Sequence, residues 1–246
     1  MTTAPLQLAP RITWATLHSR LSRDWEAGEH VTLVGPTGSG KTHLAIELLE
    51  MCRYRLVLAT KRQDPLVRGL AAKGYKITGD LKDIQWDGLQ REPIQKKVVF
   101  WPQFPEKMAV RDRLAAQASA IGKAIDWADK TGGWAVLVDE TMWLHKNLRL
   151  EKELEQMWFQ GRTQGLSVLA NSQRPSHVPR LAWSMASYIF IWQTQDKRDL
   201  ESLRDISSGF PKDLIDDSVR RLDWHAHEAL FIDTRRREMA TVIAPA

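Results

Sequence analysis

Cysteines, long apolar runs and targeting patterns are scarce or missing in this 246-residue sequence. The single cysteine, Cys52, excludes an internal disulfide and a cysteine cage for zinc, and it favours a reducing compartment. No stretch approaches the roughly 18 uninterrupted apolar residues of a membrane span, so we expect no membrane partner. Residues 1–10 lack the basic start and the apolar run of a secretory signal. The sequence therefore predicts a cytoplasmic protein in which Cys52 is a buried thiol packed in a helix.

The composition is that of a globular protein, with 43% hydrophobic and 26% charged residues, which excludes a disordered or collagen-like chain. A net charge of +5 leans mildly towards polyanionic partners. Short apolar runs alternate with longer helical stretches, a pattern typical of an α/β fold with a mostly parallel central sheet and helices on both faces. We expect one domain over residues 30–246, with a helical lead-in at 1–29 and a C-terminal extension from about residue 198.

Apolar runs rich in β-branched residues predict the strands of this sheet. These strands are Val31–Val34, Leu56–Ala59, Val98–Trp101, Trp134–Val138, Leu166–Ala170 and Tyr188–Trp192. Two further runs, Ala229–Ile232 and Met239–Ile243, predict a C-terminal β-hairpin. Helical patterns predict helices at Ile12–Ala27, Thr42–Arg53, Glu106–Lys130, Leu150–Gln160 and Asp196–Arg204.

The most specific motif is a glycine-rich loop that follows the first of these strands and opens a helix. It matches the phosphate-loop pattern at every specified position and consists of Gly35, Pro36, Thr37, Gly38, Ser39, Gly40, Lys41 and Thr42. Glycines let the backbone curl so that its N–H groups point at the β-phosphate of a nucleotide. Lys41 is predicted to reach the β- and γ-phosphates, and the Thr42 hydroxyl to coordinate Mg²⁺. The alternative to a phosphate-binding loop is a glycine-rich loop that matches the pattern by chance. As a phosphate-binding loop, the motif predicts ATP and Mg²⁺ as cofactors.

Two adjacent acids, Asp139 and Glu140, come directly after the predicted strand Trp134–Val138. The carboxyl ends of parallel strands line the ligand crevice of such sheets, so Asp139 is a candidate Mg²⁺ ligand. Glu140 is a candidate base that polarises the water attacking the γ-phosphate. The alternative is a structural role at the end of the strand. Because a kinase must exclude water, an acid placed to activate water favours ATP hydrolysis over phosphoryl transfer.

The segment Trp158–Pro175 carries a family resemblance. It contains Gly-Arg-x-x-Gly at residues 161–165, then an apolar strand, and then Ser-Gln-Arg-Pro at residues 172–175. Together with the phosphate loop and the Asp-Glu strand, this order of motifs resembles the FtsK–HerA superfamily of DNA-pumping ATPases over about residues 30–195. The compact genome-packaging ATPases of phages and viruses look most similar. The resemblance implies a RecA-like P-loop NTPase fold of the additional-strand (ASCE) type.

The resemblance also implies roles for two residues outside the loop and the acids. Gln173 matches the polar sensor of the γ-phosphate, and Arg162 matches the arginine finger that reaches the nucleotide of a neighbouring subunit. The plainer interpretations are a turn residue and a helix-end arginine that suits the helix dipole. Arg174 and Arg180 are competing finger candidates. A finger acting in trans implies a homo-oligomeric ring, either a pentamer or a hexamer.

The activity implied by the resemblance is packaging of double-stranded viral DNA into a capsid. A capsid vertex or portal would then be a further partner, and the host cytoplasm or the virion the location. Contact with DNA of any sequence needs basic residues that neutralise phosphates. The candidates, each of which could equally belong to a solvated face, are Lys61-Arg62, Arg68, Lys73 and Arg235–Arg237.

Other functions are compatible with the same motifs. They are a plasmid-transfer or DNA-repair motor of the same superfamily, a P-loop small-molecule kinase, and a nucleotide-binding assembly protein without catalysis. The region after about residue 198 matches no motif, and its histidines, among them His225 and His227, show no spacing typical of a metal site. Trp143 is expected to pack in the core rather than to stack on a base.

Overall fold

The computed structural model describes residues 9–87, 92–203, 206 and 210–245. The chain forms two compact units, each built from segments that lie far apart in the sequence. The first unit takes the described parts of Met1–Glu26, His30–Glu47 and Asn171–Ala246. The second takes those of Ala27–Glu29 and Leu48–Ala170. The predicted division of the chain at residue 30 stays a prediction.

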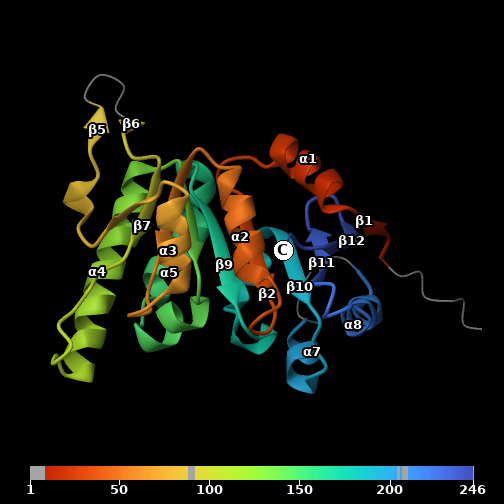
Figure 1. Ribbon diagram of the computed structural model, residues 1–246. Coiled ribbons are helices and arrows are strands. Elements are labelled where there is room, and N and C mark those ends of the chain that lie inside the picture. Colours follow the sequence, from red (N-terminus) through yellow and green to blue (C-terminus); the bar gives the residue numbers. More distant parts are fainter. Residues whose placement is uncertain (1–8, 88–91, 204–205, 207–209, 246) are drawn as a thin grey trace, which may run out of the picture. The chain divides into compact units, whose positions relative to one another are not determined.

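The sheet of the first unit mixes parallel and antiparallel strands in the order β1-β12-β11-β10-β2 (Figure 1). β2 runs parallel to β10, and β1 runs parallel to β12. Between them, β11 runs antiparallel to both β10 and β12. The strands are β1 Arg11–Ile12, β2 His30–Val34, β10 Ala186–Trp192, β11 Glu228–Asp233 and β12 Glu238–Ile243. The helices are α1 Trp14–Asp24, the larger part of α2 Lys41–Glu50, the 3-10 turn η3 Pro175–His177, α6 Arg180–Ser184, α7 Lys197–Leu203 and α8 Lys212–Arg220.

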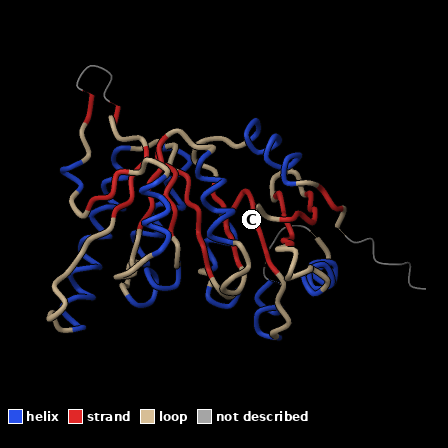
Figure 2. Tube along the Cα trace, in the orientation of Figure 1, coloured by secondary structure: helices blue, strands red, loops and turns tan. Residues whose placement is uncertain are grey.

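The main sheet of the second unit is parallel throughout, in the order β9-β8-β3-β7-β4. The strands of both units are red in Figure 2, and the helices are blue. Its strands are β3 Tyr54–Leu58, β4 Lys76–Thr78, β7 Lys97–Phe100, β8 Trp134–Val138 and the larger part of β9 Ser167–Ser172. The helical elements are α3 Pro65–Ala72, the 3-10 turn η1 Leu81–Asp83, α4 Val110–Thr131, the π-helical turn η2 Trp143–Asn147 and α5 Glu151–Gln164. A separate antiparallel pair is formed by β5 Trp86–Asp87 and β6 Glu92–Pro93.

The predicted strands are all present, and their ends differ from the prediction by at most two residues. Trp134–Val138 coincides with β8, which is buried at every position. β2 and β10 are likewise buried along their whole length, because continuous apolar runs suit strands that are covered on both faces. The α/β fold with a mostly parallel sheet and a C-terminal hairpin is therefore confirmed.

The helix ends differ more from the prediction than the strand ends do. α5 continues to Gln164, so Arg162 lies inside its last turn, and it ends at Gly165 in the left-handed conformation with a φ of 64°. α4 begins at Val110 instead of Glu106, because the chain first forms a turn after Pro105. The predicted helix Asp196–Arg204 corresponds to α7, and Arg204 lies outside the described residues. No helix in the described part of the chain is long and apolar enough to cross a membrane.

The predicted helix Thr42–Arg53 ends earlier than expected, because α2 stops at Glu50 and Cys52 lies two residues beyond it, outside any helix. It is partly buried, and burial raises the pKa of its thiol to about 12, although the nearby Arg55 guanidinium opposes this shift. Its Sγ lies 3.9 Å from the carbonyl oxygen of Leu48, which accepts a weak hydrogen bond. The thiol is therefore protonated at neutral pH and is a poor nucleophile.

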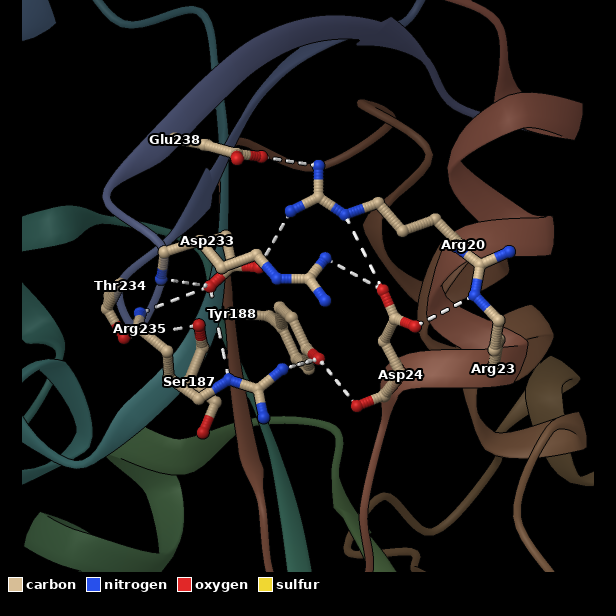
Figure 3. A network of polar contacts seen from close by, with 10 residues as sticks. Arg20, Arg23, Asp24, Ser187, Tyr188, Asp233, Thr234, Arg235 and Glu238 are labelled. Carbon is tan, nitrogen blue, oxygen red and sulfur yellow. Dashed lines mark hydrogen bonds and ion pairs between the residues drawn. The ribbon is translucent and has the colours of Figure 1, made fainter.

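A polar network joins α1 to the turn between β11 and β12 (Figure 3). At its centre is Asp233, whose side chain is only 1% exposed. Its carboxylate accepts hydrogen bonds from the Arg20 guanidinium at 2.9 Å and from the backbone N–H groups of Arg235 and Arg236 at 3.1 and 3.0 Å. The Arg236 guanidinium donates in turn to Asp24 on α1 at 2.7 Å. The network holds the lead-in helix and the hairpin together within the first unit.

We predict that Asp233→Ala lowers the free energy of unfolding by about 2 kcal/mol, because it removes hydrogen bonds to a charged, buried acceptor. Arg23→Ala is the matched control: its side chain is 73% exposed and pairs with Asp24, so its removal should change stability by less than about 0.5 kcal/mol. Urea denaturation of both variants measures the difference. Equal stabilities for the two variants would show that the network around Asp233 contributes nothing.

Candidate functional site

The predicted phosphate loop connects β2 to α2, as the motif requires. Gly38 and Gly40 have φ angles of 85° and 94°, which L-residues with side chains rarely adopt. α2 begins at Lys41, so the N-terminal end of this helix, which favours anions, follows the loop directly. The Lys41 ammonium donates a 2.9 Å hydrogen bond to the carbonyl oxygen of Pro36, across the loop. The loop thus has the curled backbone and the lysine position of a phosphate-binding site.

Gly35 is required for a different reason, because its neighbours leave no room for a side chain. A Cβ at this position would lie 2.6 Å from Cβ of Trp192, at the end of β10, and 3.2 Å from Oγ of Ser39. The N–H of Gly35 donates to the carbonyl oxygen of Ser172 at 3.2 Å, which fixes the start of the loop. Ser39 is fully buried, and its Oγ has no hydrogen-bond partner among the described residues. A buried hydroxyl without a partner is uncommon, and the loop therefore fits a nucleotide phosphate chain.

Gln173 lies beside the phosphate loop within the first unit, one residue beyond β9. The Thr37 hydroxyl donates a long hydrogen bond of 3.5 Å to its side-chain carbonyl oxygen, and both side chains are exposed. An amide in this position can hydrogen-bond to an oxygen of a phosphate bound in the loop. The structure thus brings the predicted sensor to the predicted loop, while the sensing role itself stays a prediction.

Asp139 and Glu140 follow β8 in the second unit and come just before the π-helical turn η2. The Asp139 side chain is 9% exposed and forms an ion pair with Lys61, whose Nζ lies 2.8 Å from its Oδ2. Lys61 lies three residues after β3, the strand that pairs with β8. The sequence suggested Lys61 as a DNA contact, whereas the structure directs its ammonium at the predicted Mg²⁺ ligand. The π-helical turn is a rare element that is often found at functional sites.

The backbone that carries Lys61 is held by aromatic and amide side chains. The indole N–H of Trp101 donates to the carbonyl oxygen of Lys61 at 2.7 Å. Gln117, a buried residue of α4, donates to the carbonyl oxygen of Thr60 at 2.6 Å and accepts from the indole N–H of Trp143 at 3.3 Å. Trp143 is half-buried and not part of the buried core, and its hydrogen bond ties the segment before Lys61 to the turn that follows the two acids.

The charges around Lys61 are predominantly negative. Burial disfavours the charged form of Lys61, but the hydrogen bond and charge of Asp139, together with the charges of Asp64 and Glu140, raise its pKa overall. Burial also raises the pKa of the Asp64 carboxyl, and the charge of Asp139 adds to this, while Lys61 opposes it. Carboxylate oxygens are the donors that Mg²⁺ prefers, so the carboxylate of Asp139 is chemically suited to the predicted role of Mg²⁺ ligand, which stays a prediction.

The three candidate finger arginines differ in their contacts. Arg174 forms ion pairs with Asp196 at 2.7 Å and Asp199 at 3.1 Å, so it is already engaged within the subunit. The side chains of Arg162 and Arg180 are exposed and form no hydrogen bond or ion pair within the part of the chain that the structure describes. The backbone of Arg162 is tightly packed, since a Cβ on Gly28 would lie 2.6 Å from its Cα. Arg162 therefore combines a fixed backbone with a free guanidinium.

The basic clusters have more internal partners than the sequence suggested. Arg62 pairs with Glu106 at 3.1 Å, and Arg236 pairs with Asp24. Arg235 contacts the Tyr188 hydroxyl and lies over its ring, 5.0 Å from the centroid. Much of the positive charge near the C-terminus is thus balanced inside the first unit. No cluster of potential metal ligands is present among the described residues, the histidines included.

Comparison with known proteins gives no match to any protein-family profile and no similar curated sequence. Solved structures do match. The genome packaging NTPase B204 from Sulfolobus turreted icosahedral virus 2 has a TM-score of 0.63 and 17% identity, covering 89% of this chain and 97% of that chain. VirB4 of Thermoanaerobacter pseudethanolicus has a TM-score of 0.65 and 12% identity, covering 88% and 89%.

A third match covers only part of a longer protein. The cytoplasmic domain of the Thermomonospora curvata Type VII Secretion ATPase EccC has a TM-score of 0.52 and 15% identity, and the match covers 89% of this chain and 25% of that chain. Identities this low establish the fold alone. The protein has the fold of these ATPases, and the predicted P-loop NTPase fold is confirmed.

We predict that Gly35→Ala disturbs the loop and lowers the free energy of unfolding by about 1–3 kcal/mol, because the new methyl group overlaps the Trp192 side chain. Gly69→Ala on α3 is the matched control, since nothing lies within 4 Å of its Cβ position and alanine favours a helix by about 0.5–1 kcal/mol. The free energy of unfolding, measured with denaturant, should therefore fall for Gly35→Ala and rise for Gly69→Ala. A Gly35→Ala protein as stable as the wild type would contradict the close packing at Trp192.

Proposed function

We propose that this protein is a Mg²⁺-dependent ATPase that moves double-stranded DNA, without regard to sequence, as a homo-oligomeric ring. The observation that carries the proposal is the phosphate loop, with its positive-φ glycines and with Lys41 folded across it. The fold supports the proposal, because the viral packaging NTPase B204, which has a similar fold, was solved in complex with the ATP analogues AMPPCP and ATP-gammaS. We propose packaging of a viral genome as the biological task.

In this proposal each predicted residue has a chemical task. Lys41 neutralises charge on the β- and γ-phosphates, and Thr42 and Asp139 hold Mg²⁺, which supplies further neutralisation when bound. Glu140 accepts a proton from the attacking water as its oxygen bonds to the γ-phosphorus and the bond to the leaving ADP oxygen breaks. Gln173 orients the γ-phosphate. The products are ADP and inorganic phosphate, whereas a kinase would yield a phosphorylated acceptor.

The ring follows from the proposed role of Arg162. A guanidinium at the γ-phosphate of a neighbouring subunit neutralises developing charge and is worth roughly 10³–10⁵ in rate. The exposed side chain of Arg162, without an internal partner among the described residues, leaves it available for such a contact. Head-to-tail contacts of this kind close into rings, for which we propose five or six subunits.

The structural match is nearly as extensive with VirB4 as with B204, covering 89% and 97% of those chains, so the matches support the ATPase fold without choosing among its tasks. The same fold occurs in EccC, a secretion ATPase, so the fold alone does not select the cargo. A plasmid-transfer or DNA-repair motor therefore remains the second candidate. A capsid vertex or portal is the partner we propose for the packaging ring.

The proposal predicts that long double-stranded DNA of any sequence stimulates release of phosphate from ATP. Because the stimulation depends on contacts with DNA phosphates, it should fade between about 50 and 200 mM salt. Phosphate release is measured at several protein concentrations, with and without DNA. Lys41→Ala is the control that should abolish turnover in both cases. Equal rates with and without DNA at low salt would contradict a DNA motor while leaving an ATPase intact.

The ring predicts rescue when two inactive variants are mixed. Glu140→Gln should bind ATP but hydrolyse it about 10²–10⁴-fold more slowly, since the base is lost. Arg162→Ala should also bind ATP and be slow, because the neighbouring site lacks its cation. In mixed rings up to about a quarter of the interfaces combine an intact Glu140 with an intact Arg162, and partial activity should return. Arg180→Ala mixed with Glu140→Gln is the matched comparison, and no rescue in the Arg162 mixture would remove this residue as the finger.

A further inference from the structure

A turn from the C-terminal region lies against the phosphate loop, within the first unit. The turn comprises Asp223–His227, between α8 and β11. A Cβ on Gly38 would lie 3.9 Å from Cζ2 of the Trp224 ring, and a Cβ on Gly40 would lie 3.7 Å from Nδ1 of His227. Two aromatic side chains therefore lie within van der Waals distance of the positions that Cβ atoms would take on the two glycines whose positive φ angles shape the loop. The sequence has no motif here.

The turn is rigid, because it is fixed at both ends by hydrogen bonds. The Asp223 carboxylate accepts from the backbone N–H groups of His225 and Ala226 at 2.8 and 3.3 Å. The carbonyl oxygen of His227 accepts from the N–H of Ala244, next to β12, at 3.1 Å. His227 itself has a φ of 53°, which is uncommon for a residue with a side chain. The rings are thus presented to the loop by a preformed backbone.

Three buried polar atoms without partners among the described residues belong to side chains that lie close to glycines of the phosphate loop. Nδ1 of His227 is buried, as are Oγ of Ser39 and Nε1 of Trp192, and all three atoms lack hydrogen-bond partners in the described part of the chain. Ser39 and Trp192 are 0% and 1% exposed. Both contact the Cβ position of Gly35, so the unpaired atoms belong to side chains that pack on the loop itself. Buried polar groups are usually paired, so the hydrogen bonding of the side chains that pack on the loop is incomplete in the described part of the chain.

The chemistry of the turn suits a nucleoside and does not suit phosphate. The faces of an indole ring carry negative charge density, which disfavours an anion but favours stacking on a flat heterocyclic base. Trp224 is half-buried, so part of its surface remains available. The ring nitrogens of an imidazole can form hydrogen bonds with a ribose hydroxyl or a base nitrogen. The phosphates have their own donors in the backbone N–H groups of the loop.

We infer that the Asp223–His227 turn forms the nucleoside-binding wall of the nucleotide site, with Trp224 stacking on the base and His227 hydrogen-bonding to the nucleoside. This inference rests on the proposed function, because it presupposes that the loop binds a nucleoside triphosphate. It gives the region after residue 198 a part in nucleotide binding. The turn would select a nucleotide over inorganic polyphosphate, a distinction that the phosphate loop cannot make.

The test compares two ligands that share a phosphate chain. Affinities for Mg-ATP and for Mg-tripolyphosphate are measured by calorimetry on the wild type, Trp224→Ala, Trp224→Phe and His227→Ala. We expect Trp224→Ala to lose about 5- to 100-fold in affinity for ATP while its affinity for tripolyphosphate stays within about twofold. Trp224→Phe keeps a ring and should retain most of the ATP affinity. His227→Ala should lose about fivefold for ATP alone.

The control is Trp14→Ala, which removes another half-buried tryptophan whose ring packs on His18 of α1. It should leave both affinities unchanged. Equal losses for ATP and tripolyphosphate in Trp224→Ala would mean that the turn supports the phosphate loop and binds no nucleoside. No loss for either ligand would also overturn the inference. A wild type that binds neither ligand would instead contradict the proposed function, so the two failures are distinguishable.

Discussion

The first unit depends on one constraint: aromatic side chains pack closely against the glycine backbone of the phosphate loop. The Trp192 side chain packs where a Cβ of Gly35 would be, and the Trp224 and His227 rings contact the Cβ positions of Gly38 and Gly40. The glycines therefore serve two purposes: they allow the curled backbone that binds phosphate, and they let β10 and the Asp223–His227 turn reach the loop. Local folding and ligand binding are consequently coupled at these positions.

In the second unit the corresponding constraint is a carboxylate that is nearly buried. Asp139 has a side chain with 9% exposure, and such a charge needs a cation or several hydrogen-bond donors. Lys61 supplies a cation, and its own side chain is 53% exposed. An ion pair in which one side chain is half-exposed contributes little to the stability of the fold. A divalent cation that binds Asp139 can therefore replace the Lys61 ammonium without a large loss of stability. The pair orients the Asp139 carboxylate while leaving the cation that it binds exchangeable.

Features that depend on neighbouring residues in the sequence were predictable. Contacts between residues that are far apart in the sequence were not. The strands followed from apolar runs, and the phosphate loop and the acid pair followed from short patterns in the right context. Lys61 and Asp139 are 78 residues apart, and nothing in either segment points to the other. Trp224 and His227 approach the loop only because β11 returns the chain to β10. The short helices α3, α6 and α8 begin at or directly after Pro65, Pro179 and Pro211, a start pattern that closer attention to proline would have identified.

The packing of Arg162 has a consequence for how a ring could be assembled. Its Cα is held against Gly28, and α5 ends three residues later at a left-handed glycine, so the backbone has little freedom to follow a moving partner. The reach of the guanidinium is then set by rotation about its own side-chain bonds. A neighbouring subunit that shifted by more than the length of one side chain would lose the contact altogether. With its backbone fixed, the arginine would reach a neighbouring nucleotide only when the subunits are closely spaced. ATP hydrolysis would then depend on the distance between neighbouring subunits.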